Sequence, residues 1–328
     1  MKRYLITGFS GFVAYWFLRQ LNSSCTEEKA EVLGLDLHKP KDFEQGYNFE
    51  NLTIRFMSID LLDRKSLEIS LQAFCPDYIL HLAAFSSVGE SWRNPVDCYA
   101  NNTNIFLNIV EAVRQNRIKC RILSIGSSEE YGNVSKADVP LREDSALTPI
   151  SPYAIARVSQ EMLSKCYVDS FSLDIVMTRS FNHIGPRQRD IFVIPSFAKQ
   201  IVYGLLDGKQ EVELTTGDVS IVRDFTDVRD VVRAYDFLLR NGKTGEIYNV
   251  CSGRGQPIAD IIQIIADKLG VKVSTKVSPA LVRPNDNMII IGDNTKLHSQ
   301  TGWKPEHSLE STLDDMIEWW RGRYEFAK

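Results

Sequence analysis

Short apolar runs alternate with helical apolar patterns through the first half of the chain, and this alternation restricts the possible folds more than any other feature. Strands separated by helices form βαβ units, whose right-handed crossovers make the strands parallel. An apolar run such as DYILHLAA, residues 77–84, suits a strand that is buried on both faces. We therefore expect an α/β fold, a Rossmann-type doubly wound parallel sheet with a smaller, interleaved C-terminal domain.

The same patterns predict the individual elements. Strands are expected at residues 3–8, 31–36, 54–60, 77–84, 120–128, 173–180 and 246–253. Helices are expected at residues 12–21, 64–74, 104–116, 228–242 and 257–270, and another begins near Ser151. Gly242 is the expected C-cap of its helix, and Pro257 stands at the start of the next one.

Composition narrows the possible partners and the compartment. The 328-residue chain has a net charge of −4, so it offers no broad basic surface and we expect no nucleic-acid partner. No apolar run reaches the roughly 18 residues of a membrane span, and no signal sequence precedes the first strand. The six cysteines form no CxxC pair, and the histidines lack metal-ligand spacing. We expect a cytoplasmic protein with no membrane contact, buried free thiols and no metal.

The turn TGFSGFVA, residues 7–14, follows the first strand and opens the first helix. Glycines at positions 8 and 11 let the backbone turn tightly and approach a pyrophosphate, which the helix N-terminus stabilises. Ala14 stands where close packing between helix and strand needs a small residue. Such a pattern is often only a turn, but its place after the first strand favours dinucleotide binding. The residues of this turn expected to bind the cofactor are Gly8, Ser10, Gly11, Phe12 and Val13.

Two further strand ends extend the expected cofactor site. Asp36 ends the second strand, where a carboxylate accepts both hydroxyls of the adenosine ribose and repels a 2′-phosphate. NAD(H) is therefore favoured, although the nearby His38 and Lys39 leave NADP(H) possible. Asp60 and Leu61 follow the third strand and are expected to frame the adenine.

The segment HLAAFSSV, residues 81–88, leaves its strand with mostly small residues, which let a dinucleotide lie against the strand end. His81 lies within the apolar strand, so we assign it a structural role. From this segment we expect cofactor contacts from Leu82, Ala83 and Ala84 and a substrate contact from Ser86.

Groups able to move a proton follow the fifth strand and begin a later helix. SSEEYG, residues 127–132, offers the Ser127 hydroxyl and the Glu129 carboxylate at a sheet edge where ligands bind. In SPYAIARVS, residues 151–159, Tyr153 and Arg157 are four residues apart and share one helix face. A cation beside a phenol stabilises the phenolate, which helps the phenol to donate a proton. Alone, the Ser/Glu run would be a solvated loop; with Tyr153 it can manage a proton on a sugar oxygen.

With these motifs in order, the chain resembles the extended short-chain dehydrogenase/reductase (NAD-dependent epimerase/dehydratase) family over roughly residues 3–305. Within it, the chain is most similar to the GDP-4-keto-6-deoxymannose reductase group, a sibling of GDP-mannose 4,6-dehydratase. The stretches that carry the closer likeness are ILSIGSSEEYG, SPYAIA, TRSFNHIGPRQ, VRDFTDVRDVV, YNVCSG and TGWKP. The resemblance implies a homodimer formed through helices near 104–116 and 153–169.

The resemblance also implies roles. Ser127 would hydrogen-bond the C4 oxygen of the sugar, and Tyr153 would exchange a proton with it while hydride moves to or from nicotinamide. Arg157 stands where the family has a lysine that holds the nicotinamide ribose. The residues implied to hold the nucleotide sugar are Ser86, Ser128, Asn182, Val193, Arg223, Arg283 and Asp286. The dinucleotide domain would then span residues 1–180 with about 226–252, and the nucleotide-sugar-binding domain residues 181–225 and 253–328.

Arg157 is the clearest departure from the family pattern. Its permanent charge can still favour the phenolate of Tyr153, and its guanidinium can donate to ribose hydroxyls. Arginine is longer than lysine and cannot release a proton into a relay. Three outcomes stay open: an enzyme adapted to arginine, which we favour, a slow enzyme that holds NAD(H) tightly, and a nucleotide-sugar sensor with little turnover.

Whether the chain reduces its sugar substrate or removes water from it also stays open. A 4,6-dehydratase needs a base for the C5 proton and an acid for the C6 hydroxyl group, and Glu129 is placed for such work. The FNHIGPRQ loop favours reduction, whereas an internally recycled NAD, as in dehydratases and epimerases, would suit Asp36. We expect an enzyme that reduces the C4 ketone of a GDP-4-keto-6-deoxyhexose to a GDP-rhamnose-type product.

Overall fold

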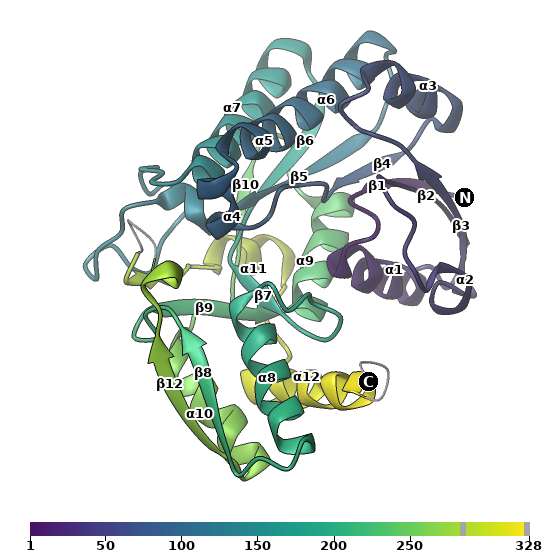
Figure 1. The fold of residues 1–328 in the computed structure, drawn as a ribbon. Coiled ribbons are helices and arrows are strands. Elements are labelled where there is room, and N and C mark those ends of the chain that lie inside the picture. Colours follow the sequence, from purple (N-terminus) through teal and green to yellow (C-terminus); the bar gives the residue numbers. More distant parts are fainter. Residues whose placement is uncertain (283–286, 325–328) are drawn as a thin grey trace.

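The computed structural model describes residues 1–282 and 287–324, and within them seven parallel strands form one sheet (Figure 1). The spatial order of the strands is β10-β6-β5-β4-β1-β2-β3. Their bounds are β1 Arg3–Thr7, β2 Ala30–Asp36, β3 Leu52–Ser58, β4 Tyr78–His81, β5 Arg121–Ser127, β6 Asp174–Ser180 and β10 Ile247–Val250. The order reverses direction between β1 and β4, and such a switch point opens a crevice at the carboxyl ends of the strands. The expected Rossmann-type sheet is confirmed.

Helices cover both faces of this sheet, as Figure 1 shows. Successive residues of β1 serve the two faces: Ile6 packs into the core beneath α1 and α9, and Leu5 into the core beneath α3, α6 and α7. The buried strands need apolar residues on both sides, which explains their nearly continuous apolar runs. The bounds are α1 Phe12–Ser24, α3 Arg64–Phe74, α6 Ile105–Gln115, α7 Pro152–Phe171 and α9 Val228–Asn241.

A smaller group of elements lies below the carboxyl ends of the strands in the view of Figure 1. It has its own apolar core, in which Phe197, Ile261 and Trp320 are buried. Its strands are β7 Asn182–Ile184, β8 Glu211–Thr216, β9 Val222–Asp227, β11 Gly255–Pro257, β12 Lys272–Val277 and β13 Ile289–Ile290. Its helices are α8 Val193–Leu206, α10 Ile258–Leu269 and α12 Leu309–Tyr324. The domain boundaries given above stay a prediction.

Several elements differ from the expected bounds. The strand predicted at 77–84 ends at His81, and Leu82–Ala84 instead turn out of the sheet. The strand predicted at 120–128 ends at Ser127, because Ser127 caps a 3-10 helix, η2 Ser128–Tyr131. Sequence patterns missed α4 Val88–Arg93, α5 Pro95–Tyr99 and the π-helical turn η1 Ala100–Asn104, which are too short for a periodic signal. The remaining short helices are α2 Phe43–Gly46, η3 Pro279–Leu281 and α11 Thr295–Thr301.

Two further features concern membrane-spanning helices and the cysteines. Across the described ranges, no helix is both long and apolar enough to cross a membrane. All six cysteines are free, but only Cys98 and Cys251 are buried. The expectation of buried thiols is wrong for Cys75, which is the C-cap of α3, and for Cys166, which lies within α7, because both are exposed.

Candidate active site

A cavity of about 700 Å³ opens where the carboxyl ends of the sheet strands face β7, β9 and the start of α8. This volume is suited to a small-molecule ligand or cofactor. Its walls include the turn after β1, the ends of β2 to β5, the first turns of α7 and the segment 180–195. The crevice at the switch point of the sheet is therefore the candidate site.

The turn after β1 lets a ligand approach its backbone closely. Gly8 has a φ of +66°, and a Cβ there would lie 2.7 Å from the backbone nitrogen of Ala83. Only glycine therefore fits where this turn crosses the backbone that follows β4. Gly11 is the N-cap of α1, and no side chain caps this helix end. The free N–H groups of its first turn can bind a phosphate, so these residues fit a dinucleotide.

The carboxylate of Asp36 lies at the cavity wall at the end of β2. It accepts hydrogen bonds from the backbone nitrogens of Ser10, at 2.9 Å, and Leu37, at 2.7 Å. A carboxylate has about four acceptor positions, so capacity remains for ribose hydroxyls. Lys39 is engaged by Glu44 at 2.5 Å, and neither it nor His38 is among the described residues that line the cavity.

Ser127 is oriented by its own 3-10 helix. Its Oγ accepts a hydrogen bond from the backbone nitrogen of Glu129 at 3.2 Å. Because the oxygen is used as an acceptor, the hydroxyl hydrogen is left to donate to a ligand oxygen. Ser127 and Glu129 both line the cavity.

Tyr153 and Arg157 lie on the first two turns of α7, whose N-cap is Ser151; its Oγ accepts from the nitrogen of Ala154 at 3.1 Å. Both side chains line the cavity yet are nearly buried, with Tyr153 7% and Arg157 5% exposed. The guanidinium carbon lies 5.3 Å from the centre of the phenol ring, within the range of a cation–π contact. The arginine therefore stays beside the tyrosine.

A buried network fixes the Arg157 guanidinium. One terminal nitrogen, Nη1, donates to the carbonyl oxygen of Ile125 at 3.0 Å and to Oε1 of Gln160 at 2.7 Å. The Gln160 amide is oriented in turn, because its nitrogen donates to Oγ of Ser124 at 2.9 Å. Gln160 and Ser124 are buried. Two acceptors, the Ile125 backbone in the cavity wall and the buried Gln160, thus hold Nη1 in place, while the buried Nε has no hydrogen-bond partner.

His81 is structural, as its apolar strand predicts. Its Nδ1 lies 2.9 Å from Oγ1 of Thr7 and links β4 to β1. Burial, reinforced by the charge of Arg157, lowers the pKa of His81 from its usual value to about 3. The imidazole is therefore neutral and does not line the cavity.

The structure brings most of the predicted site residues together. Ser128 is the exception within the described ranges, because its side chain is buried and does not line the cavity. Arg283 and Asp286 lie outside the described residues. The predicted residues that line the cavity are Gly8, Ser10, Gly11, Phe12, Val13, Asp36, Asp60, Leu61, Leu82, Ala83, Ala84, Ser86, Ser127, Glu129, Tyr153, Arg157, Asn182, Val193 and Arg223.

The sequence analysis missed several cavity residues. Arg187 and Arg189, in the polar run after β7, line the cavity with Arg223, and guanidinium groups suit phosphate oxygens. Arg223 was expected from its position in the family resemblance, and that resemblance gave no such role to Arg187 or Arg189. Tyr235, on α9, gave no signal, because it lies on the apolar face of its helix; its hydroxyl group pairs with Oγ of Ser180 at 2.7 Å.

The glycine turn, the carboxylate of Asp36 and the pair of Tyr153 and Arg157 in one crevice define a dinucleotide-binding enzyme of the short-chain dehydrogenase/reductase class. The family model described as GDP-mannose 4,6 dehydratase matches residues 5–316. The chain belongs to this family of NAD(P)-dependent nucleotide-sugar enzymes.

Known relatives share both sequence and fold with the chain. It is 36% identical to the GDP-6-deoxy-D-mannose reductase of Pseudomonas aeruginosa over 264 residues, which cover 80% of this chain and 86% of the relative. The structure of RMD from Pseudomonas aeruginosa complexed with NADPH has a TM-score of 0.81 and 31% identity, and covers 98% of this chain and 100% of its own. The Thermus thermophilus UDP-glucose 4-epimerase complex with NAD has a TM-score of 0.81 and 28% identity, and covers 98% and 99%. NAD(H) and NADP(H) both fit the site.

Proposed function

We propose that the protein reduces the C4 ketone of a GDP-linked 4-keto-6-deoxyhexose to a GDP-rhamnose-type product. The observation that carries this proposal is the inventory of proton-transferring groups around Tyr153. Ser127, Tyr153 and Arg157, which a ketone reduction requires, meet in one cavity. Of the described residues that line the cavity, Glu129 is the only carboxylate besides Asp36 and Asp60, which end β2 and follow β3 at the adenosine side of the sheet.

A 4,6-dehydratase would need more than this. Removal of the C5 proton and expulsion of the C6 hydroxyl group call for a base and an acid. Glu129 can serve as one of them, and Ser128 beside it is buried and is not among the described residues that line the cavity. The incomplete pair favours reduction, and the similarity to the GDP-6-deoxy-D-mannose reductase supports it.

The reduction assigns one task to each side chain. When bound, the reduced nicotinamide supplies hydride to C4. The Ser127 hydroxyl group donates a hydrogen bond to the C4 oxygen, and Tyr153 transfers its proton to that oxygen, so the ketone becomes an alcohol. Arg157 stabilises the tyrosinate that remains, which regains a proton from solvent. Arg187, Arg189 and Arg223 carry the charge needed for the diphosphate.

We also propose NAD(H) as the preferred cofactor. The free acceptor positions of Asp36 suit ribose hydroxyls, and its charge opposes a 2′-phosphate. Lys39 could have offset that charge, but it is paired with Glu44.

The test offers purified protein GDP-4-keto-6-deoxymannose with NADH or NADPH. We expect one reduced cofactor to be consumed per sugar, with NADH used more efficiently. Loss of water from GDP-mannose without net change in cofactor would make the protein a dehydratase. Tight cofactor binding without turnover on any keto-sugar would make it a sensor.

A further inference from the structure

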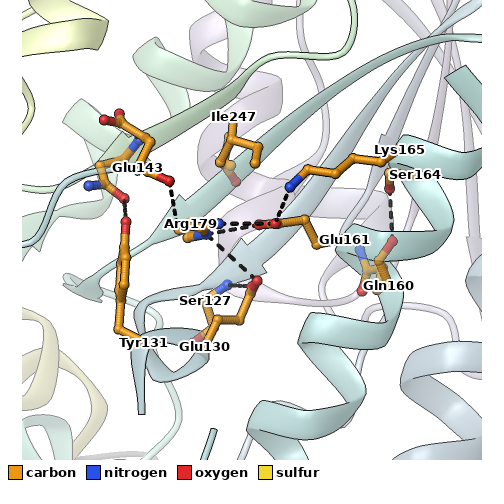
Figure 2. Close-up of polar contacts among 12 residues, drawn as sticks. Ser127, Glu130, Tyr131, Glu143, Gln160, Glu161, Ser164, Lys165, Arg179 and Ile247 are labelled. Carbon is orange, nitrogen blue, oxygen red and sulfur yellow. Dashed lines mark hydrogen bonds and ion pairs between the residues drawn. The ribbon is translucent and has the colours of Figure 1, made fainter. Parts of the chain in front are cut away.

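Directly behind Ser127, a buried cluster of ionisable side chains remains unexplained by the proposed chemistry (Figure 2). Its members come from η2, β6 and α7: Glu130 is 0% exposed, Arg179 2% and Glu161 4%. Such burial is costly for ionised groups unless each is paired. The ion pairs and hydrogen bonds within the cluster therefore decide which of its members can be charged.

Glu130 is tied to the backbone of the site. Its Oε1 accepts a hydrogen bond from the backbone nitrogen of Ser127 at 2.6 Å, and Ser127 caps the same 3-10 helix in return. The neighbouring Gly126 leaves room for this carboxyl group, since a Cβ there would lie 2.3 Å from Oε1. The loop is thus shaped around the Glu130 carboxyl group.

The nearby arginine is engaged elsewhere. Arg179 binds Glu161 through two nitrogens, at 2.8 and 3.0 Å, and also donates to the backbone oxygen of Glu143 at 3.0 Å. Its nearest approach to Glu130 is 3.9 Å, and Oε2 of Glu130 makes no hydrogen bond. One arginine is therefore shared by two buried carboxyl groups, and Glu161 holds it.

The charges facing Glu130 leave it as the protonated member. Glu161 on α7 adds negative charge, and Lys165 on the same helix binds Glu161 at 3.0 Å. Arg179 faces Glu130 from β6, and Glu143, in the loop before α7, lies beyond Arg179. On η2 itself, the Tyr131 hydroxyl group donates a hydrogen bond to the side chain of Asn249. Burial first, and then the charge of Glu161, raises the pKa of Glu130 to about 8.

We propose that Glu130 is a positioning residue: as a neutral acid it holds the Ser127 loop in its working geometry, and loss of its proton at alkaline pH displaces that loop. This inference rests on the proposed reductase function, because that function assigns Ser127 to the substrate ketone. If Glu130 ionised, its carboxylate would be a second buried anion beside that of Glu161. The repulsion between the two carboxylates would move Glu130 out of its fit against Gly126. Activity then falls at alkaline pH for a reason separate from Tyr153.

The first test compares pH–activity profiles of the wild-type protein, Glu130→Gln and Glu143→Gln. Glutamine keeps the acceptor for Ser127 and cannot ionise, so Glu130→Gln should retain kcat near neutral pH within about twofold and extend the alkaline limb to higher pH. Glu143→Gln removes a charge from the same cluster without touching Ser127, and its alkaline limb should match that of the wild type. An unchanged limb in Glu130→Gln overturns the proposal.

Two measurements need no substrate, and they separate this inference from the proposed reaction. A carboxyl group whose pKa is raised in the folded state makes the folded state bind more protons than the unfolded state from its usual pKa up to about 8. The melting temperature of the wild type should therefore fall relative to that of Glu130→Gln as pH rises through this range; parallel curves overturn the proposal. If the variant does not fold, infrared spectra of the wild type still decide: a protonated carboxyl band must be present at neutral pH and vanish under alkaline conditions, and its absence overturns the proposal.

Discussion

At the scale of single residues, Arg157 shows how an arginine can occupy a position that suits a compact amine. The guanidinium is longer than an ammonium group and carries more N–H donors. Here Ile125 and Gln160 both accept from Nη1, which fixes the group 5.3 Å from the ring centre of Tyr153, whereas the buried Nε has no hydrogen-bond partner. The positive charge is therefore retained beside the phenol.

This arrangement predicts the effect of substitutions at Arg157. Removing the charge in Arg157→Met should lower kcat about a hundredfold, because the tyrosinate loses its stabilising cation. Arg157→Lys keeps a charge but leaves the Gln160 acceptor unpaired, and it should lose about tenfold. Steady-state kinetics with a keto-sugar substrate measures both, and NADH binding followed by fluorescence serves as the control for cofactor affinity. A lysine variant no better than the methionine variant would contradict this account of the charge.

His81 gives a stability prediction at the same scale. Its pKa of about 3 in the folded protein lies below the unfolded value, so the unfolded chain binds the extra proton and stability falls as pH drops from about 6.5 towards 3. Between about pH 7.5 and pH 5 the wild type should lose on the order of 2 kcal/mol relative to His81→Asn, which has no titrating ring. Urea unfolding of both proteins at the two pH values measures the difference. An equal loss in both would mean that other groups dominate.

At the scale of elements, the parts of the fold that depend on local pattern were predictable, and the parts that depend on distant contacts were not. The apolar runs placed the strands, and the turn at Gly8 placed the cofactor cradle. No local pattern indicates that Arg187 would pair with Asp42, which lies 145 residues earlier in the chain. Likewise, the spacing placed Arg157 beside Tyr153 but gave no indication that the backbone oxygen of Ile125, 32 residues earlier in the chain, accepts from its guanidinium. The family resemblance implied a substrate contact from Ser128, which in the structure is buried and is not among the described residues that line the cavity.

The loop between β7 and α8 is held against α1 by such distant contacts. Arg187 lies over the ring of Tyr15, with its guanidinium carbon 3.8 Å from the ring centre, and forms an ion pair with Asp42. The indole nitrogen of Trp16 donates to the backbone oxygen of Pro186 at 3.0 Å. Phe12 of the cofactor turn stacks on His183 at 5.7 Å. The loop therefore links α1, which is expected to bind the cofactor, to the opposite wall of the cavity.

This coupling predicts that Arg187→Ala weakens the binding of both ligands. The loop loses its ion pair and its contact with Tyr15, and the cavity loses a cation, so KM for cofactor and for nucleotide sugar should each rise about tenfold with a smaller change in kcat. Arg19→Ala is the control, because Arg19 lies on α1 with its guanidinium over the ring of Trp16 but is not among the described residues that line the cavity. If only the KM for the nucleotide sugar rises, Arg187 binds the diphosphate but does not couple the loop between β7 and α8 to cofactor binding.

At the scale of the whole molecule, one exposed face carries apolar side chains that a monomer would leave in water. Val96 is 79% exposed, Ile155 47%, Met162 44% and Tyr99 44%, and they lie on α5 and α7, which pack side by side in Figure 1. A shallow apolar groove runs between Val96, Tyr99 and Ile155. Exposed apolar patches of this kind are typical of protein interfaces. The resemblance implies a dimer through helices near 104–116 and 153–169; residues 104–116 carry no exposed large apolar side chain, so we predict that a second copy of the chain would instead cover this face of α5 and α7.

The homodimer implied by family resemblance thus has a specific surface to be tested. The double variant Val96→Glu and Ile155→Glu places charges at the centre of the groove, where pairing two copies would bury them without partners, so it should be monomeric at concentrations at which the wild type is dimeric. Analytical ultracentrifugation measures the mass of each. Leu206→Glu on α8, also exposed but away from this face, should leave the dimer intact. Because the described cavity is lined within one chain, the monomer should still bind NADH. A wild type that sediments as a monomer, or a double variant that stays dimeric, would show that this face is not the interface.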